Sequence, residues 1–203
     1  MAAPTTIVWF RQDLRIADNP ALLAAARRGP VVPVYLLADD GEGDWAYGGA
    51  KQVYLHQALE SLDAALCEIG LRLIFRKTDD SLAELKTLIE QTCASTVHWN
   101  RRYEPAAIRR DSAIKAALKK DRIEVESFNG SLLYEPHEVA TQKGDPYKVF
   151  TPYWRACNAL GQPDAPRKKP SKSDVQGPDA WPDSLVLDDL GLMPDHAWAK
   201  KIA

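Results

Sequence analysis

Residues 8–23 read VWFRQDLRIADNPALL, and this stretch decides which fold the sequence predicts. An apolar run ends at Phe10 and is followed directly by the polar residues Arg11, Gln12 and Asp13. Asp18-Asn19-Pro20 then has the residue types that open a helix. The stretch therefore predicts a buried strand, a polar junction and a helix. Ligands of open α/β sheets bind at such junctions, beyond the carboxyl ends of the strands.

The same alternation of strand and helix continues to residue 128. Apolar runs rich in β-branched and aromatic residues predict strands buried on both faces, and amphipathic segments between them predict helices. The expected strands are Thr6–Phe10, Val31–Leu37, Leu71–Arg76, Thr96–Asn100 and Ile123–Phe128, and the expected helices are Asn19–Arg28, Lys51–Ile69, Ser81–Thr92 and Pro105–Lys120. This pattern predicts an α/β fold, a doubly wound, Rossmann-like sheet of five parallel strands.

Three parts of the chain differ in composition. We expect an α/β domain over residues 1–130, the end of that domain with a short terminal helix over 131–160, and an irregular linker over 161–203. The linker is rich in proline, serine and lysine, and we expect it to cross a surface without building a core. Because a linker needs something at its far end, we expect the chain to stop before a further domain.

Four aromatic residues accompany the short terminal helix, namely Tyr147, Phe150, Tyr153 and Trp154. We expect them to dock this helix onto its own domain. The alternative is a platform on which nucleic-acid bases stack.

Overall composition excludes several classes of protein. The 203 residues carry a net charge of −2, which gives no overall attraction to nucleic acid or to a membrane surface. No run approaches the roughly 18 apolar residues of a membrane helix, and the first residues lack a signal pattern. The three cysteines are too few and too widely spaced for a disulfide framework. We expect a cytoplasmic protein, a monomer without membrane contact.

Motifs of several common enzyme classes are absent from the sequence. It contains neither GxGxxG nor GxxxxGK[ST], the glycine-rich loops that hold nucleotide phosphates. HExxH and GxSxG are missing too, and the four histidines show no ligand spacing. These absences argue against a dehydrogenase, a hydrolase and a metal site, so we predict no catalytic residue and no metal ligand in this chain.

Four motifs, in order, resemble the N-terminal part of the photolyase and cryptochrome family. They are WFRQDLRIADNPAL (9–22), GGAKQVYLHQALESLDAAL (48–66), WNRRYEP (99–105) and GDPYKVFTPYWRAC (144–157). The first is similar to the family signature aromatic-Phe-Arg-x-Asp-Leu-Arg, which is followed by Asp-Asn and an apolar pair. The resemblance covers about residues 5–160.

This resemblance implies an N-terminal α/β domain that holds a light-harvesting antenna chromophore. A larger helical domain of the family holds FAD and binds UV-damaged DNA, where light-driven electron transfer from reduced FAD splits cyclobutane pyrimidine dimers. The chain would contain the antenna domain and the interdomain linker, and by itself would be inactive as a deoxyribodipyrimidine photo-lyase. The alternatives are the same domain of a cryptochrome-type blue-light photoreceptor and a free-standing nucleotide-binding α/β protein.

The candidate chromophore ligands follow the ends of the predicted strands or begin the second helix. They are Phe10, Arg11, Leu36, Leu37, Asp39, Lys51, Arg102 and Glu104. If the first strand lies between the second and the fourth, the reversal of strand order brings the strand tips around one crevice. Phe10 fits the core equally well. The alternative for Arg11, Asp13 and Arg15 is a salt-bridged turn that fixes the loop.

The chromophore itself stays open between methenyltetrahydrofolate, a deazaflavin and FMN. Ala106 and Ala107 stand where many folate-binding members of the family have Asn-Glu. Arg102 stands where deazaflavin or FMN binders usually have an acidic residue. The sequence therefore departs from the pattern of each group.

Overall fold

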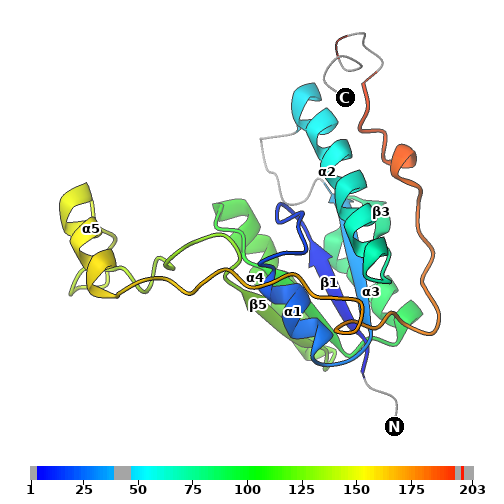
Figure 1. Cartoon of the computed structure of the whole chain (residues 1–203), viewed down its shortest axis with the longest axis horizontal. Helices are drawn as coiled ribbons and strands as arrows, with labels where there is room; N and C mark the ends of the chain where they lie inside the picture. The colour runs from blue at the N-terminus through cyan, green and yellow to red at the C-terminus, as the bar shows by residue number, and fades with distance from the viewer. Residues whose placement is uncertain (1–3, 39–46, 195–197, 199–203) are drawn as a thin grey trace.

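A parallel sheet of five strands forms the centre of the computed structural model, which describes residues 4–38, 47–194 and 198. The strands lie in the order β3-β2-β1-β4-β5 (Figure 1). They are β1 (Thr6–Phe10), β2 (Val31–Ala38), β3 (Ile74–Thr78), β4 (Thr96–Asn100) and β5 (Glu124–Phe128). The predicted fold class is confirmed. Because β1 pairs with both β2 and β4, strand order reverses beside β1, which is the condition under which the strand tips surround one crevice.

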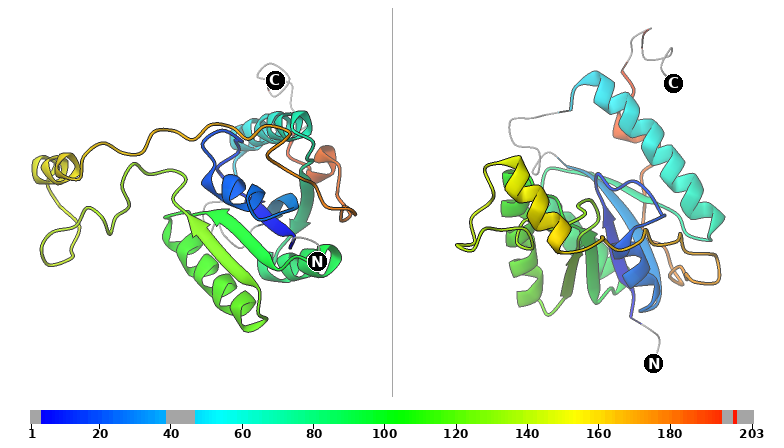
Figure 2. Two further views of the ribbon diagram at one scale, coloured as in Figure 1. Left: turned by 60° about the horizontal axis from the view of Figure 1, so that its bottom comes forward. Right: turned by 60° about the vertical axis from the view of Figure 1, so that its left-hand side comes forward.

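Helices cover both faces of this sheet, as Figure 2 shows. They are α1 (Pro20–Ala26), α2 (Gly49–Glu68), α3 (Ser81–Thr92) and α4 (Pro105–Lys120). Side chains of α1 and α2 share one core with Val8 and Phe10, and those of α3 and α4 share the other with Ile7 and Trp9. None of the described helices is long and apolar enough to cross a lipid bilayer.

Capping residues explain where two of these helices begin. The Asn19 side chain accepts a hydrogen bond from the Leu22 amide at 3.1 Å, and Pro20 occupies the first helical position of α1. The Asp80 carboxylate accepts hydrogen bonds from two amides of the first turn of α3. These caps place both helix starts where the sequence predicts them.

The third strand begins later than the sequence predicts. Leu71 and Leu73 are buried in the core, but β3 begins at Ile74. The Leu73 amide donates instead to the Asp63 carboxylate of α2 at 2.8 Å. An apolar run indicates burial without showing which of its residues join the sheet.

The C-terminal strap, defined here as residues 175–192, packs against the domain, so the expectation that this linker builds no core is wrong. Ser184 accepts a hydrogen bond from the Phe75 amide at 2.9 Å, and the Leu185 amide donates to the Phe75 carbonyl at 3.0 Å. Leu190 and Leu192 are 1% and 3% exposed in the core beside α2. The composition of the strap did not predict this packing, because only a few of its residues, such as Leu190 and Leu192, enter the core.

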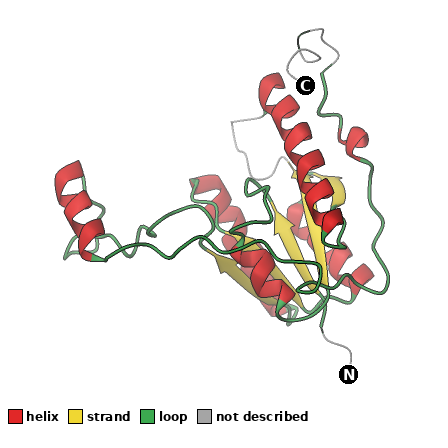
Figure 3. Cartoon of the chain, viewed as in Figure 1, coloured by secondary structure: helices red, strands yellow, loops and turns green. Residues whose placement is uncertain are grey.

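The short terminal helix α5 (Phe150–Ala159) extends away from the sheet, at the far left of Figures 1 and 3. The expectation that its aromatic residues dock it onto the α/β domain is therefore wrong. Phe150 and Trp154 are 71% and 53% exposed. Their rings stack on each other, with centroids 6.2 Å apart. One helical turn separates the two residues, so they contact each other in place of the domain.

Replacing Leu190 by alanine tests whether the C-terminal strap belongs to the core. Loss of this buried side chain is expected to lower the free energy of unfolding by about 2–5 kcal/mol. Val186→Ala, at a neighbouring position that is 64% exposed, is expected to change it by less than about 0.5 kcal/mol. Urea unfolding measures both, and equal effects would show that the strap contributes little.

We expect the stability of the fold to depend on pH because of His98 on β4. Its side chain is fully buried, and burial lowers its pKa although Nδ1 lies 3.4 Å from the Ala21 carbonyl oxygen. Below the ordinary histidine pKa of about 6.5, the unfolded chain binds a proton that the folded chain does not. The free energy of unfolding should therefore fall as the pH decreases from about 6.5. Urea unfolding at pH 7.5 and 5.5 measures this decrease in the free energy of unfolding. The decrease should be smaller for His98→Phe than for the wild-type chain, and equal decreases would show that His98 is not its cause.

Candidate functional site

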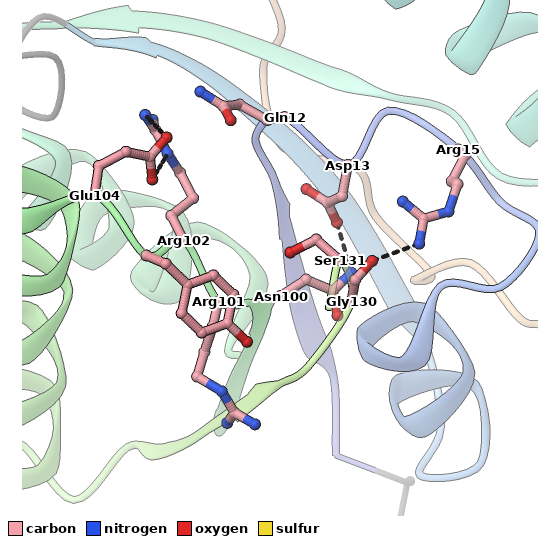
Figure 4. Close-up of a pocket in the computed structure, with 10 residues that line it drawn as sticks. Gln12, Asp13, Arg15, Asn100, Arg101, Arg102, Glu104, Gly130 and Ser131 are labelled. Carbon is pink, nitrogen blue, oxygen red and sulfur yellow. Dashed lines mark hydrogen bonds and ion pairs between the residues drawn. The ribbon is translucent and has the colours of Figure 1, made fainter. Parts of the chain in front are cut away.

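A cavity of about 420 Å³ opens at the carboxyl ends of β1, β4 and β5. It lies where the strand order reverses, the usual ligand position in open α/β sheets. Its lining residues are Gln12, Asp13, Arg15, Asn100, Arg101, Arg102, Tyr103, Glu104, Gly130 and Ser131. Figure 4 shows Arg102 and Glu104 on one side and Asp13 and Arg15 on the other. A cavity of this volume is large enough for a small organic ligand.

A buried polar network joins the strands beneath the cavity. The Asn100 amide group donates to the Asp13 carboxylate at 2.6 Å and to the Asn19 side-chain oxygen at 2.9 Å. Asp13 also accepts from the Arg11 backbone amide at 3.0 Å. The polar junction after β1 is therefore a structural link from β1 to β4 and to the start of α1.

The loop after β5 supplies another wall of the cavity. Arg15 donates to the Gly130 carbonyl at 2.6 Å and to the Asp18 carbonyl at 2.9 Å. A Cβ atom on Gly130 would lie 2.6 Å from the Asn100 side chain, so only glycine permits this close approach. Arg15 thus fixes the loop through carbonyl oxygens, whereas its distance to the Asp18 carboxylate is 4.0 Å.

An ion pair forms the opposite rim of the cavity. Arg102 donates to the two carboxylate oxygens of Glu104 at 3.3 and 3.1 Å. These hydrogen bonds lower the pKa of Glu104, which keeps the carboxylate charged at neutral pH. The Arg102 side chain is 9% exposed and that of Glu104 48%. The carboxylate oxygens of Glu104 are therefore exposed as hydrogen-bond acceptors, and Arg102 orients them.

Arg11 lies below this site and is almost fully buried. It donates to the Asp111 carboxylate of α4 at 2.5 Å and to the Asn100 carbonyl. Its guanidinium carbon also lies 4.9 Å from the centre of the Trp9 ring. Burial lowers the pKa of Arg11, and the Asp111 carboxylate opposes this shift. Arg11 thus joins β1 to β4 and α4 as a structural cation.

A model of DNA photolyase matches residues 6–171. The chain belongs to the DNA photolyase family. It is 43% identical over 196 residues to a deoxyribodipyrimidine photo-lyase of Agrobacterium fabrum, a match covering 96% of this chain and 40% of that relative. It is 39% identical over 168 residues to cryptochrome-1 of Arabidopsis thaliana, covering 82% of this chain and 25% of that relative. The chain thus spans two fifths or less of the length of these two relatives.

Solved structures of the photolyase family have the same fold. A bacterial class III photolyase from Agrobacterium tumefaciens superposes with a TM-score of 0.89 at 43% identity, covering 99% of this chain and 41% of that one. A cryptochrome of Synechocystis superposes with a TM-score of 0.81 at 19% identity, covering 96% and 41%. This second likeness concerns the fold alone.

The predicted chromophore ligands of this photolyase-family domain divide between two cavities, and Arg102 lines both. Arg102 and Glu104 line the 420 Å³ cavity. Arg11, Leu36, Leu37 and Arg102 line a second cavity of only about 20 Å³, beside β1 and β2, which is large enough for about one water molecule.

Two other predicted ligands, Phe10 and Lys51, do not line the large cavity. Phe10 is 0% exposed within the core shared with α1 and α2, which favours the alternative that it is a core residue. Lys51 lies in the first turn of α2, with Nζ 3.6 Å from the centre of the Tyr47 ring. It is not among the described residues that line either cavity. Asp39 lies outside the described residues.

Eight of the ten residues that line the cavity were not among the predicted ligands, namely Gln12, Asp13, Arg15, Asn100, Arg101, Tyr103, Gly130 and Ser131. Gln12 and Tyr103 belong to the motifs after β1 and β4. Their position just beyond a strand end could therefore have identified them as cavity residues. Gly130 and Ser131 reach the cavity because β5 lies beside β4, and a local motif does not contain that information.

The substitution Arg11→Met tests whether Arg11 stabilises the fold. The substitution is expected to lower the free energy of unfolding by about 1.5–3 kcal/mol. Asp111 and the Asn100 carbonyl lose hydrogen bonds from a charged group, while Asp111 keeps its ion pair with Arg110. Arg28→Met is the matched control, since the Arg28–Glu124 pair is more exposed and is expected to contribute at most about 1 kcal/mol. Urea unfolding compares the two. Equal small losses would contradict a structural role for Arg11.

Proposed function

We propose that this chain is the antenna-chromophore-binding domain of a DNA photolyase whose full-length form repairs cyclobutane pyrimidine dimers with light and reduced FAD. The observation that carries the proposal is the 420 Å³ cavity at the strand reversal of a photolyase-family domain. The match to the photolyase covers 96% of the chain and that to the cryptochrome 82%, which favours repair over signalling. The FAD site and the surface for damaged DNA would belong to the longer protein.

The residues of the cavity fit a planar ligand with polar edges. Glu104 offers carboxylate oxygens on one rim, while Gln12 and Ser131 offer groups that both donate and accept. The candidates are methenyltetrahydrofolate, a deazaflavin and FMN. A bound chromophore would supply the absorption of light and the transfer of excitation to FAD. The protein's part is to hold the ring in one orientation, for which the hydrogen-bonded walls are suited.

Titration of the purified chain with each of the three chromophores tests this function. One of them is expected to give a saturable, shifted absorption band. Glu104→Gln should weaken its binding roughly tenfold to a hundredfold, because a hydrogen bond to a charged group contributes about 1.5–3 kcal/mol.

The matched control is Glu124→Gln. Glu124 also pairs with an arginine, but it begins β5, at the amino ends of the strands, whereas the cavity lies at their carboxyl ends. Its replacement should leave the binding unchanged. Absence of a saturable band with all three chromophores would overturn the proposed function.

A further inference from the structure

Among the described residues that line the 420 Å³ cavity, Tyr103 is the one with an aromatic side chain. It follows β4 and is half-buried, so part of its surface remains accessible from the cavity. Its hydroxyl group donates to the Glu135 carboxylate at 2.9 Å. Burial and the hydrogen bond to Glu135 raise the pKa of Tyr103, so the phenol stays protonated and keeps this hydrogen bond at neutral pH.

Glu135 holds two neighbouring residues of the cavity wall through one oxygen atom. Besides the Tyr103 hydroxyl, this oxygen accepts hydrogen bonds from Nε and Nη2 of Arg101 at 2.8 and 2.5 Å. Glu135 is 7% exposed although it lies in a loop. Burial alone would raise the pKa of Glu135, but the hydrogen bonds from Arg101 and Tyr103 outweigh it and lower the pKa. The carboxylate therefore stays charged at neutral pH.

The same cluster also reaches the loop that forms another wall. The Tyr103 hydroxyl lies 3.4 Å from the Asn129 side-chain oxygen, which accepts from the Ser131 amide at 3.3 Å. Arg101 in turn donates to the Ser127 hydroxyl at 3.2 Å. The end of β4, the end of β5 and the following loop are thus joined around one aromatic ring.

We propose that Tyr103 is the surface on which the flat ring of the bound chromophore stacks, and that Glu135 is a positioning residue that fixes Tyr103 and Arg101. This inference rests on the proposed function of the cavity. A phenol ring attached through its hydroxyl group has little rotational freedom. It therefore gives a planar ligand one preferred orientation as well as contact area.

The alternative is that Glu135 merely attaches its loop to the domain. Attachment alone would affect the stability of the fold and leave the orientation of a bound chromophore unchanged. The decisive readout is therefore the induced circular dichroism of the chromophore band, measured together with the dissociation constant and the urea midpoint.

The experiment titrates methenyltetrahydrofolate, a deazaflavin and FMN into the wild-type chain and into Tyr103→Leu, Tyr103→Phe and Glu135→Gln. Tyr103→Leu is expected to weaken binding roughly threefold to tenfold through the loss of stacking. Tyr103→Phe keeps the ring and should bind within about threefold of wild type. Both Tyr103→Phe and Glu135→Gln should reduce the induced circular dichroism at saturation, because the ring is less firmly held.

Glu124→Gln is again the matched control, with expected wild-type values for binding and induced circular dichroism. If the wild-type chain binds a chromophore and Tyr103→Leu binds it equally well, the stacking assignment is overturned while the proposed function stands. If Glu135→Gln loses stability but keeps the full induced circular dichroism, the positioning role is overturned. If the wild-type chain binds none of the three, the proposed function fails and this inference fails with it.

Discussion

The hydrogen bond from Asn100 to the Asp13 carboxylate is the contact on which the candidate site depends. It joins the end of β4 to the turn after β1, across the gap at which the strand order reverses. Asn19 completes the network and at the same time caps α1. Asn19 and Asn100 are buried, where an unpaired polar group is costly, so the network favours a single arrangement of these three segments.

Four arginines near this network have different tasks, although all follow β1 or β4. Arg11 pairs with Asp111 inside the fold, and Arg15 holds the loop after β5 through carbonyl oxygens. Arg101 binds Glu135, and Arg102 orients Glu104 at the rim. Arg15, Arg101 and Arg102 thus fix separate parts of the cavity wall, and Arg11 fixes the fold below it. Such preorganisation suits a site that must hold a ligand in one orientation.

The C-terminal strap stabilises a part of the domain that lies away from the cavity. It adds a hydrogen-bonded contact to β3, the strand at one edge of the sheet, and its leucines fill the core below α2. An uncovered edge strand presents unpaired backbone groups, so this contact also protects part of the sheet. The helix α5 has no comparable role in the α/β domain, because Phe150 and Trp154 stack on each other and remain exposed.

The sequence by itself determined the α/β class, the strands near β1, β2 and β4, and the helix starts at Asn19 and Asp80. These features depend on the spacing of apolar residues and on caps within a few residues, which a single sequence displays. Only the tertiary structure decided that Phe10 is buried, that Gly130 lies against Asn100, and that Glu135 holds Tyr103 and Arg101. The contacts of Gly130 and Glu135 join segments about 30 residues apart in the sequence. Local periodicity contains no information about which distant side chains meet.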